Sequence, residues 1–264
     1  MTTAPADVGA WARRVLAPNP GPMTLEGTNT WLLAAPHTRG CVVVDPGPDD
    51  EQHLRAILTD VGDAGQQVQR ILLTHGHPDH AEGAAHLAAL TKAPVQALDP
   101  RHRVGSQGLA PGDELVADGL RVLVVSAPGH TSDSVAFLLP DAGALLTGDT
   151  VLGAGWTVVA FPDGQLGEYL HTLSRLRDVV HGQHVSQILP GHGPVVTDPA
   201  ERIDAYLEHR SQRLAQVRAA VASGATTADQ VVATVYADVP VALWPAAKLS
   251  VQAQLADLRQ PGSG

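Results

Sequence analysis

Cysteine is almost absent from this chain, which carries a single one, Cys41, in 264 residues. One cysteine excludes an internal disulfide bond. Cys41 lies in the apolar run CVVVD, which is typical of a strand, so we expect a small buried side chain there and not a reactive thiol.

Aromatic residues and positive charge are also scarce. Aromatic residues make up 3% of the chain while hydrophobic residues make up 44%, which predicts a core of Ala, Val and Leu. The chain has 17 basic and 27 acidic residues and a net charge of −10. An acidic chain receives no general electrostatic help in binding nucleic acid, although a local arginine patch can still provide it. The basic clusters are RHRVG at residue 101 and the arginines of the tail, Arg202, Arg210, Arg213 and Arg218. Acidic neighbours dilute the tail cluster, so a solvated helix surface is expected there.

Long apolar runs and targeting signals are missing too. No apolar run approaches the ~18 residues that a membrane-spanning helix needs. The N-terminal residues lack the apolar core of a signal peptide. These observations predict a cytoplasmic protein with no membrane partner, and they leave the oligomeric state open.

Short apolar runs dominate the region from about residue 30 to residue 190. They are four to eight residues long, rich in Val, Ile and Leu, and bounded by Gly, Pro or Asp, which is typical of strands. Helical repeats lie between them, over 50–61, 79–92 and 166–180, and Asp118-Gly119 predicts a two-residue hairpin. This mixture predicts a layered α/β (α+β) fold. The segment before residue 30, rich in Pro and Gly, is expected to be a loop.

The pattern changes after Asp198-Pro199, where strand-like runs stop. A long helix and two or more shorter ones are expected there. We therefore predict two domains, residues 1–198 with the mixed fold and residues 199–264 with a small helical fold.

The stretch THGHPDH concentrates candidate metal ligands directly after an apolar run. It places His75, His77, Asp79 and His80 in a loop at the end of a predicted strand, where sites in α/β layers collect. Imidazole and carboxylate are the ligands that Zn²⁺ takes when thiolate is absent. Four such side chains within six residues favour a metal site over a solvated polar loop.

Three further strand ends repeat one layout, an apolar run followed by glycine and a ligand-type residue. SAPGH presents His130, LLTGD presents Asp149 and ILPGH presents His192. Each is weak alone, but together the set is large enough for two metal ions that share one carboxylate. The predicted ligands are His75, His77, Asp79, His80, His130, Asp149 and His192.

These motifs, together with VVVDPG around Asp45, resemble the ordered motifs of the metallo-β-lactamase fold over roughly residues 20 to 198. NPGPMTLEGTNTWLL and the helical tail resemble the subgroup of β-lactamase-like protein 2 endoribonucleases, whose tail is winged-helix-like. The resemblance implies an αββα sandwich with the site at one edge of two sheets. It also implies that the first metal is held by His75, His77 and His130, the second by Asp79, His80 and His192, and that Asp149 bridges them.

Two such ions activate water and polarise the bond to be cleaved, so we expect a dinuclear metal-dependent hydrolase that uses a metal-bound hydroxide. Zinc is the expected metal, and iron and manganese are compatible with the ligand set. No G-x-S-x-G, P-loop or G-x-G-x-x-G motif offers a competing mechanism. Asp79 is expected to act in catalysis as well as ligation, by orienting that hydroxide or passing its proton.

The substrate remains open between several alternatives. The subgroup implies an endoribonuclease acting on single-stranded RNA, and glyoxalase II implies a small thioester or ester. β-Lactam hydrolysis is less favoured, because zinc β-lactamases of one subgroup carry cysteine where Asp149 stands. The non-enzymatic alternative is a partner-binding module in which metal stabilises only the fold.

Five residues are candidates for a supporting or pocket role. The resemblance makes Asp45 a support near the site, and Asn29 lies in a loop that flanks the site or forms a plain turn. Trp156 and Phe161 follow Asp149 and either line the pocket or pack in the core, and His171 either faces the substrate or is structural. Histidines without a partner signal, His53 and His209 among them, are expected at the surface.

Overall fold

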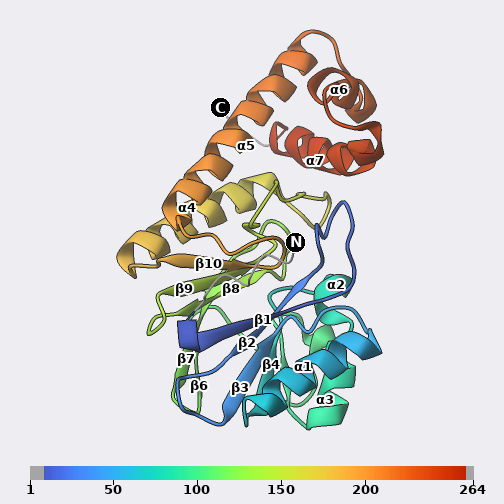
Figure 1. Cartoon of the computed structure of the whole chain (residues 1–264). Helices are drawn as coiled ribbons and strands as arrows, with labels where there is room; N and C mark the ends of the chain where they lie inside the picture. Colours follow the sequence, from blue (N-terminus) through green and yellow to red (C-terminus); the bar gives the residue numbers. More distant parts are fainter. Residues whose placement is uncertain (1–8, 260–264) are drawn as a thin grey trace.

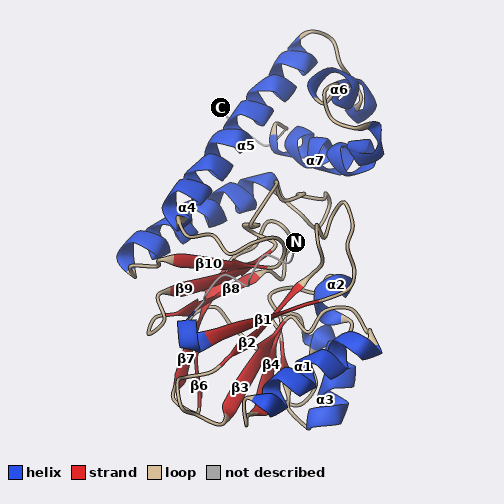
Figure 2. Ribbon diagram, viewed as in Figure 1, coloured by secondary structure: helices blue, strands red, loops and turns tan. Residues whose placement is uncertain are grey.

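The computed structural model describes residues 9–259 and shows two sheets packed face to face between helices (Figure 1; Figure 2). The first sheet has the order β1-β2-β3-β4-β5 and the second β10-β9-β8-β7-β6, each with parallel and antiparallel pairs. The strands of the first sheet are β1 (Ala12–Leu16), β2 (Asn29–Leu33), β3 (Gly40–Val44), β4 (Gln67–Leu72) and β5 (Val95–Gln96). Those of the second are β6 (Glu114–Ala117), β7 (Leu120–Ser126), β8 (Val135–Leu139), β9 (Ala144–Gly148) and β10 (Gln187–Pro190).

Helices cover the outer face of each sheet. The α-helices are α1 (Glu51–Asp63), α2 (Pro78–Ala81), α3 (Ala84–Thr91), α4 (Leu166–Gly182), α5 (Pro199–Ala222), α6 (Ala228–Val235) and α7 (Trp244–Asp257). Short 3-10 turns occur at η1 (Gly9–Trp11), η2 (Pro100–His102) and η3 (Val241–Leu243). No helix within residues 9–259 combines the length and the apolar character needed to cross a lipid bilayer.

Strand alternation explains the layers. In β3, Val42 and Val44 point into the core between the sheets, whereas Cys41 and Val43 point outward against α1 and α3. Both faces of the strand are buried, so the run CVVV is continuously apolar. On the far side, Leu145 of β9 and Leu173 of α4 share a third core cluster. The αββα sandwich that the sequence predicts is confirmed.

Local predictions divide into confirmed and wrong ones. The hairpin is confirmed, since Ala117 pairs with Leu120 across a turn in which Asp118 and Gly119 both have positive φ. The loop expected before residue 30 is wrong in part, because β1 adds an edge strand to β2 there. The helix expected over 79–92 is interrupted at Gly83, whose amide donates to the carbonyl of Gly47 (2.9 Å).

The long helix α5 joins the sandwich to the tail. Its first half places Ile203 and Tyr206 in the core cluster of α4 and the second sheet. Its second half places Val217 and Ala220 in a separate cluster with α6 and α7. The domain division at 198/199 stays a prediction, and the outermost residues of both domains, 1–8 and 260–264, lie outside the described residues.

Burial makes the Cys41 thiol unreactive, and this is testable. The side chain is fully buried, and desolvation raises its pKa to about 12. We expect no modification of the folded protein by a thiol reagent at pH 8 and complete modification in denaturant, measured by mass spectrometry. Rapid labelling of folded protein would contradict this packing.

Candidate metal centre

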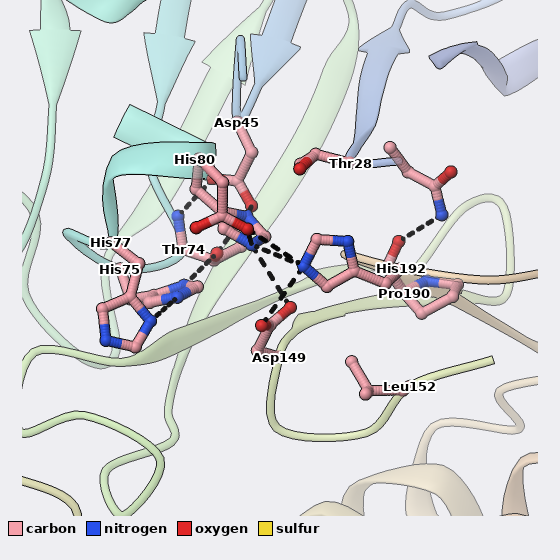
Figure 3. A network of polar contacts seen from close by, with 12 residues as sticks. Thr28, Asp45, Thr74, His75, His77, His80, Asp149, Leu152, Pro190 and His192 are labelled. Atoms are coloured by element: carbon pink, nitrogen blue, oxygen red, sulfur yellow. Dashed lines mark hydrogen bonds and ion pairs between the residues drawn. The ribbon is translucent and has the colours of Figure 1, made fainter. Parts of the chain in front are cut away.

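The predicted ligands come from four strand ends that meet at one edge of the sandwich. Figure 3 shows predicted ligands from the ends of β4, β9 and β10, with His80, Asp149 and His192 among those labelled. The loop after β4 carries His75 and His77, the short helix α2 that follows carries Asp79 and His80, and the loops after β7, β9 and β10 carry the other three. Glycine before the ligand is required at all three ends that carry it. A Cβ atom at Gly129 would overlap the backbone of Tyr169, and one at Gly148 would overlap the side chain of Thr74. A Cβ atom at Gly191 would lie 2.5 Å from Asp149 Oδ1.

Three imidazoles form the first group of ligand atoms. The Nδ1 atom of His77 lies 3.1 Å from Nε2 of His75 and 3.1 Å from Nε2 of His130. All three residues offer ligand atoms that fall within 4.8 Å of one another, so one cation can contact them all.

The second group combines imidazole with carboxylate. Nε2 of His192 lies 3.2 Å from Asp79 Oδ2 and 3.3 Å from Nε2 of His80. Asp149 stands between the groups, with its Oδ2 atom 3.4 Å from His192 and 3.8 Å from His130. The structure thus brings together all seven predicted ligands.

Two buried imidazole rings, those of His130 and His192, each form a hydrogen bond through Nδ1, and this orients Nε2 toward the centre. Nδ1 of His130 and of His192 face the carbonyls of Val158 (2.8 Å) and Gly27 (3.1 Å). Carbonyl oxygens only accept, so both rings carry a proton on Nδ1 and offer Nε2 inward. This is the arrangement of metal-ligating histidine, and the donor set fits a divalent cation.

Asp45 and Thr74 hold the loop of the first four ligands. The amide of Thr74 donates to Asp45 Oδ1 (2.8 Å), and its hydroxyl donates to Oδ2 (2.6 Å). Asp45 Oδ2 also lies 2.9 Å from Nδ1 of His80, and the Thr74 hydroxyl lies 3.0 Å from Nδ1 of His75. Asp45 therefore orients the ligands from behind and lies outside the ligand groups.

Asn29 supports the opposite side. Its side-chain amide donates to the carbonyls of Pro190 (3.0 Å) and Gly193 (2.9 Å), which flank the loop of His192. The Asn29 side chain therefore holds the backbone of the His192 loop in place.

Charge is balanced within the centre. Burial and the charges of His80 and His130 lower the pKa of His75 well below its usual value, and burial lowers the pKa of His130. For His192, burial opposes protonation, but Asp149 and Asp79 outweigh it and raise the pKa to about 9. Burial alone would raise the pKa of Asp149, but His80 and His192 lower it well below its usual value. The carboxylate is therefore ionised, the form that binds metal.

A cleft of about 440 Å³ opens onto the centre, with His130 and Asp149 in its lining. Trp156 lies in its wall, 41% exposed, and stacks on His209 at 4.0 Å between ring centroids. The structure places Phe161 and His171 together in a different hollow, which contains none of the predicted ligands.

Two surface predictions for histidine are wrong. His53 is 2% exposed, and its Nε2 lies 2.9 Å from Thr30 Oγ1, because it falls on the buried face of α1. His209 is partly buried against Trp156 in the cleft. Burial and the charges of Arg210 and Arg213 lower the pKa of His209 to about 4.

The solvated surface expected for the tail arginines is wrong for Arg202 and Arg210, whereas Arg218 is exposed. Arg210 is 4% exposed and donates to the carbonyl of Thr157, and Arg202 donates to the carbonyls of Leu152 and Gly155. The roles of Thr74 and of these arginines near the centre were not predicted from the sequence. Thr74 directly precedes the first ligand in the motif, but its partner Asp45 lies 29 residues away, so the sequence carries no local sign of their contact.

Two facing mixed sheets between helices, with imidazoles and carboxylates converging at one edge, define a hydrolase-type fold with a candidate metal site. Residues 23–192 match the metallo-beta-lactamase superfamily, and residues 227–263 match the beta-lactamase associated winged helix domain. The chain belongs to the metallo-beta-lactamase superfamily, whose members are mostly hydrolases that bind divalent metals. The winged-helix tail that the sequence predicts is confirmed.

Three known proteins are similar to this chain over most of its length. A Beta-lactamase-like protein 2 homolog of Drosophila melanogaster is 34% identical over 94% of this chain and 88% of its own length. The thioesterase pkgB of Emericella nidulans is 33% identical over 79% of this chain and 58% of its own. The crystal structure of a metallo-beta-lactamase family protein from Thermus thermophilus has a TM-score of 0.78 and 23% identity, covering 95% of this chain and 94% of that one.

The Thr74 hydroxyl should matter for metal affinity. Thr74→Val removes the donor to Asp45 and the contact with His75, and we expect affinity for Zn²⁺ to fall about 10- to 100-fold. Competition against a chromophoric chelator measures this. Thr91→Val, which removes a hydroxyl bonded to the Leu87 carbonyl in α3, is the matched control. Equal affinity of both variants would show that Thr74 does not orient the ligands.

Proposed function

We propose that the protein is a metal-dependent hydrolase of acyl thioesters or esters. The observation that carries this proposal is the cleft that runs from His130 and Asp149 to the tail. Its walls are mainly apolar, which suits the acyl part of such a substrate. Apolar side chains of three segments line it: Pro22, Met23, Leu25, Leu152, Val239 and Leu243.

The seven predicted ligands would hold two divalent ions, zinc first among the candidates. Bound there, such ions supply an acidic water and polarise the carbonyl. The side chain of Asp79 is 29% exposed, against 12% for Asp149, so it is the carboxylate better placed to exchange a proton with solvent. In the reaction, water adds a hydroxyl group to the acyl carbon, the C–S or C–O bond breaks, and the leaving sulfur or oxygen takes the remaining proton.

Two observations favour a thioester or ester over single-stranded RNA. The cleft is predominantly apolar. A relative 33% identical to the chain is a thioesterase. An open cleft at the centre also favours an enzyme over a module in which metal only stabilises the fold, because structural sites are closed.

Hydrolysis assays test the proposal directly. The metal-loaded protein is expected to hydrolyse an acyl thioester, read from release of free thiol. Chelated protein and His77→Ala should lose at least ~99% of this activity, since removing a catalytic metal removes its water. Labelled single-stranded RNA is tested in parallel. RNA cleavage without thioester or ester hydrolysis, by protein confirmed to hold metal, would overturn the proposal in favour of the endoribonuclease.

Acyl chain length should reveal the cleft. Ala246 lines it on α7, and Ala246→Phe shortens the apolar wall available to the substrate. We expect kcat/KM for an octanoyl thioester to fall about tenfold, at ~0.8 kcal/mol per CH₂ no longer buried, and that for an acetyl thioester to stay unchanged. Ala222→Phe, on an exposed position outside the cleft, is the control. Equal losses for both acyl lengths would place the substrate elsewhere.

A further inference from the structure

The wall of the cleft formed by α5 carries positive charge without a neutralising carboxylate. Arg210 and Arg213 line the cleft, and Arg202 lies on the same helix. All three bind backbone carbonyls, and within residues 9–259 none of them forms an ion pair. This is unusual in a chain with 27 acidic residues and a net charge of −10.

Of the three arginines, Arg210 is the one whose charge is buried without an anionic partner among the described residues. Its side chain is 4% exposed, and a buried cation ordinarily has an anionic partner. Its guanidinium lies 5.0 Å from the ring centre of Tyr169 and donates to the carbonyl of Thr157, while its Nε atom is buried with no hydrogen-bond partner. The described chain therefore supplies dipoles and an aromatic face to this charge, but no anion.

The charge is also fixed relative to the metal centre. Arg210 lines the same cleft as His130 and Asp149. Thr157, which accepts from Arg210, donates its own hydroxyl to the carbonyl of Asp149 (2.6 Å). One residue thus links the guanidinium to the backbone of the predicted bridging ligand.

Arg213 extends the positive wall toward the tail. It donates to the carbonyl of Val235 (2.8 Å) and lies 4.7 Å from the ring centre of Tyr236. The cleft lining contains Asp238 at this end, but that side chain is exposed and not paired with either arginine.

We propose that Arg210, assisted by Arg213, binds an anionic group of the substrate, a carboxylate or a phosphate, while the bond to be cleaved lies at the metal centre. Guanidinium suits both anions because its planar N–H groups match two oxygens at once. The site would select substrates by charge at a set distance from the reacting carbonyl. This inference rests on the proposed function for the reacting bond and on the cleft alone for the anion.

Four thioesters separate the two sources of the anion. Glutaryl and pentanoyl groups differ by one terminal carboxylate, and each is joined either to 4′-phosphopantetheine, which carries a phosphate, or to pantetheine, which does not. With metal-loaded, full-length protein we expect kcat/KM to be about tenfold or more higher for the anionic member of one pair, as for a hydrogen bond to a charged group. A preference within the acyl pair identifies carboxylate, and one within the thiol pair identifies phosphate.

Variants of the two arginines test whether they cause the preference for the anionic thioester, measured as the ratio of kcat/KM between the two members of the pair. Arg210→Met should abolish this preference, Arg210→Lys should retain part of it, and Arg213→Met should reduce it. Arg218→Met, an exposed position of the same helix outside the cleft lining, should leave it intact. Thermal melting of each variant checks folding, and Arg213→Met decides the matter if Arg210→Met does not fold.

Failure of this inference and failure of the proposed function give different results. Equal kcat/KM for all four thioesters overturns the anion site and leaves the hydrolase intact. If none is hydrolysed, the proposed function falls, and titration with glutarate and with inorganic phosphate still tests the anion site. Wild type should then bind one of them about tenfold more tightly than Arg210→Met, and equal affinities would overturn the inference.

Discussion

The geometry of the candidate metal centre depends most on the hydrogen bonds of one buried carboxylate, that of Asp45. It joins the end of β3 to the loop after β4 through two bonds to Thr74, and it meets the ring of His80 directly. Asp45 is 2% exposed, so water cannot replace these hydrogen bonds if they are lost. The conformation of the loop after β4 therefore depends on the Asp45 side chain. Because that loop and the helix α2 that follows it carry four of the seven predicted ligands, one carboxylate positions much of the site.

The sandwich makes this contact possible. Parallel pairing of β3 with β4 brings Val44 level with Leu72, so the residues that follow both strands emerge at the same edge. Parallel pairing of β9 with β10 does the same for Asp149 and His192 in the other sheet. An apolar core cluster holds the two sheets face to face, and the two pairs of strand ends therefore meet at the same edge of the sandwich.

The helix α5 gives the centre its surroundings. One half is packed in the sandwich and the other in the winged-helix domain, so the wall of the cleft is continuous with both cores. Aromatic residues are few, yet Trp156, Tyr206 and Tyr169 gather along this helix beside its arginines. Cation–π contacts there hold the arginines in place without neutralising them.

The sequence by itself predicted the strands other than β1, the ligand-type residues and the family, because alternation, glycine before a ligand and short-range spacing are local patterns. The motif THGHPDH and the three strand ends contained all seven predicted ligands that the structure brings together. Only the tertiary structure decided what lies around them. The edge strand β1 has a weak sequence pattern and forms because β2 is available to pair with it. His53 is buried because it lies on the face of α1 that packs inward.

The arginines of α5 resemble a diluted basic surface in the sequence. Folding places the loop 152–157 against Arg202 and Arg210, and its carbonyls accept their hydrogen bonds. Contacts across 50 or more residues depend on how layers pack, which no local pattern records.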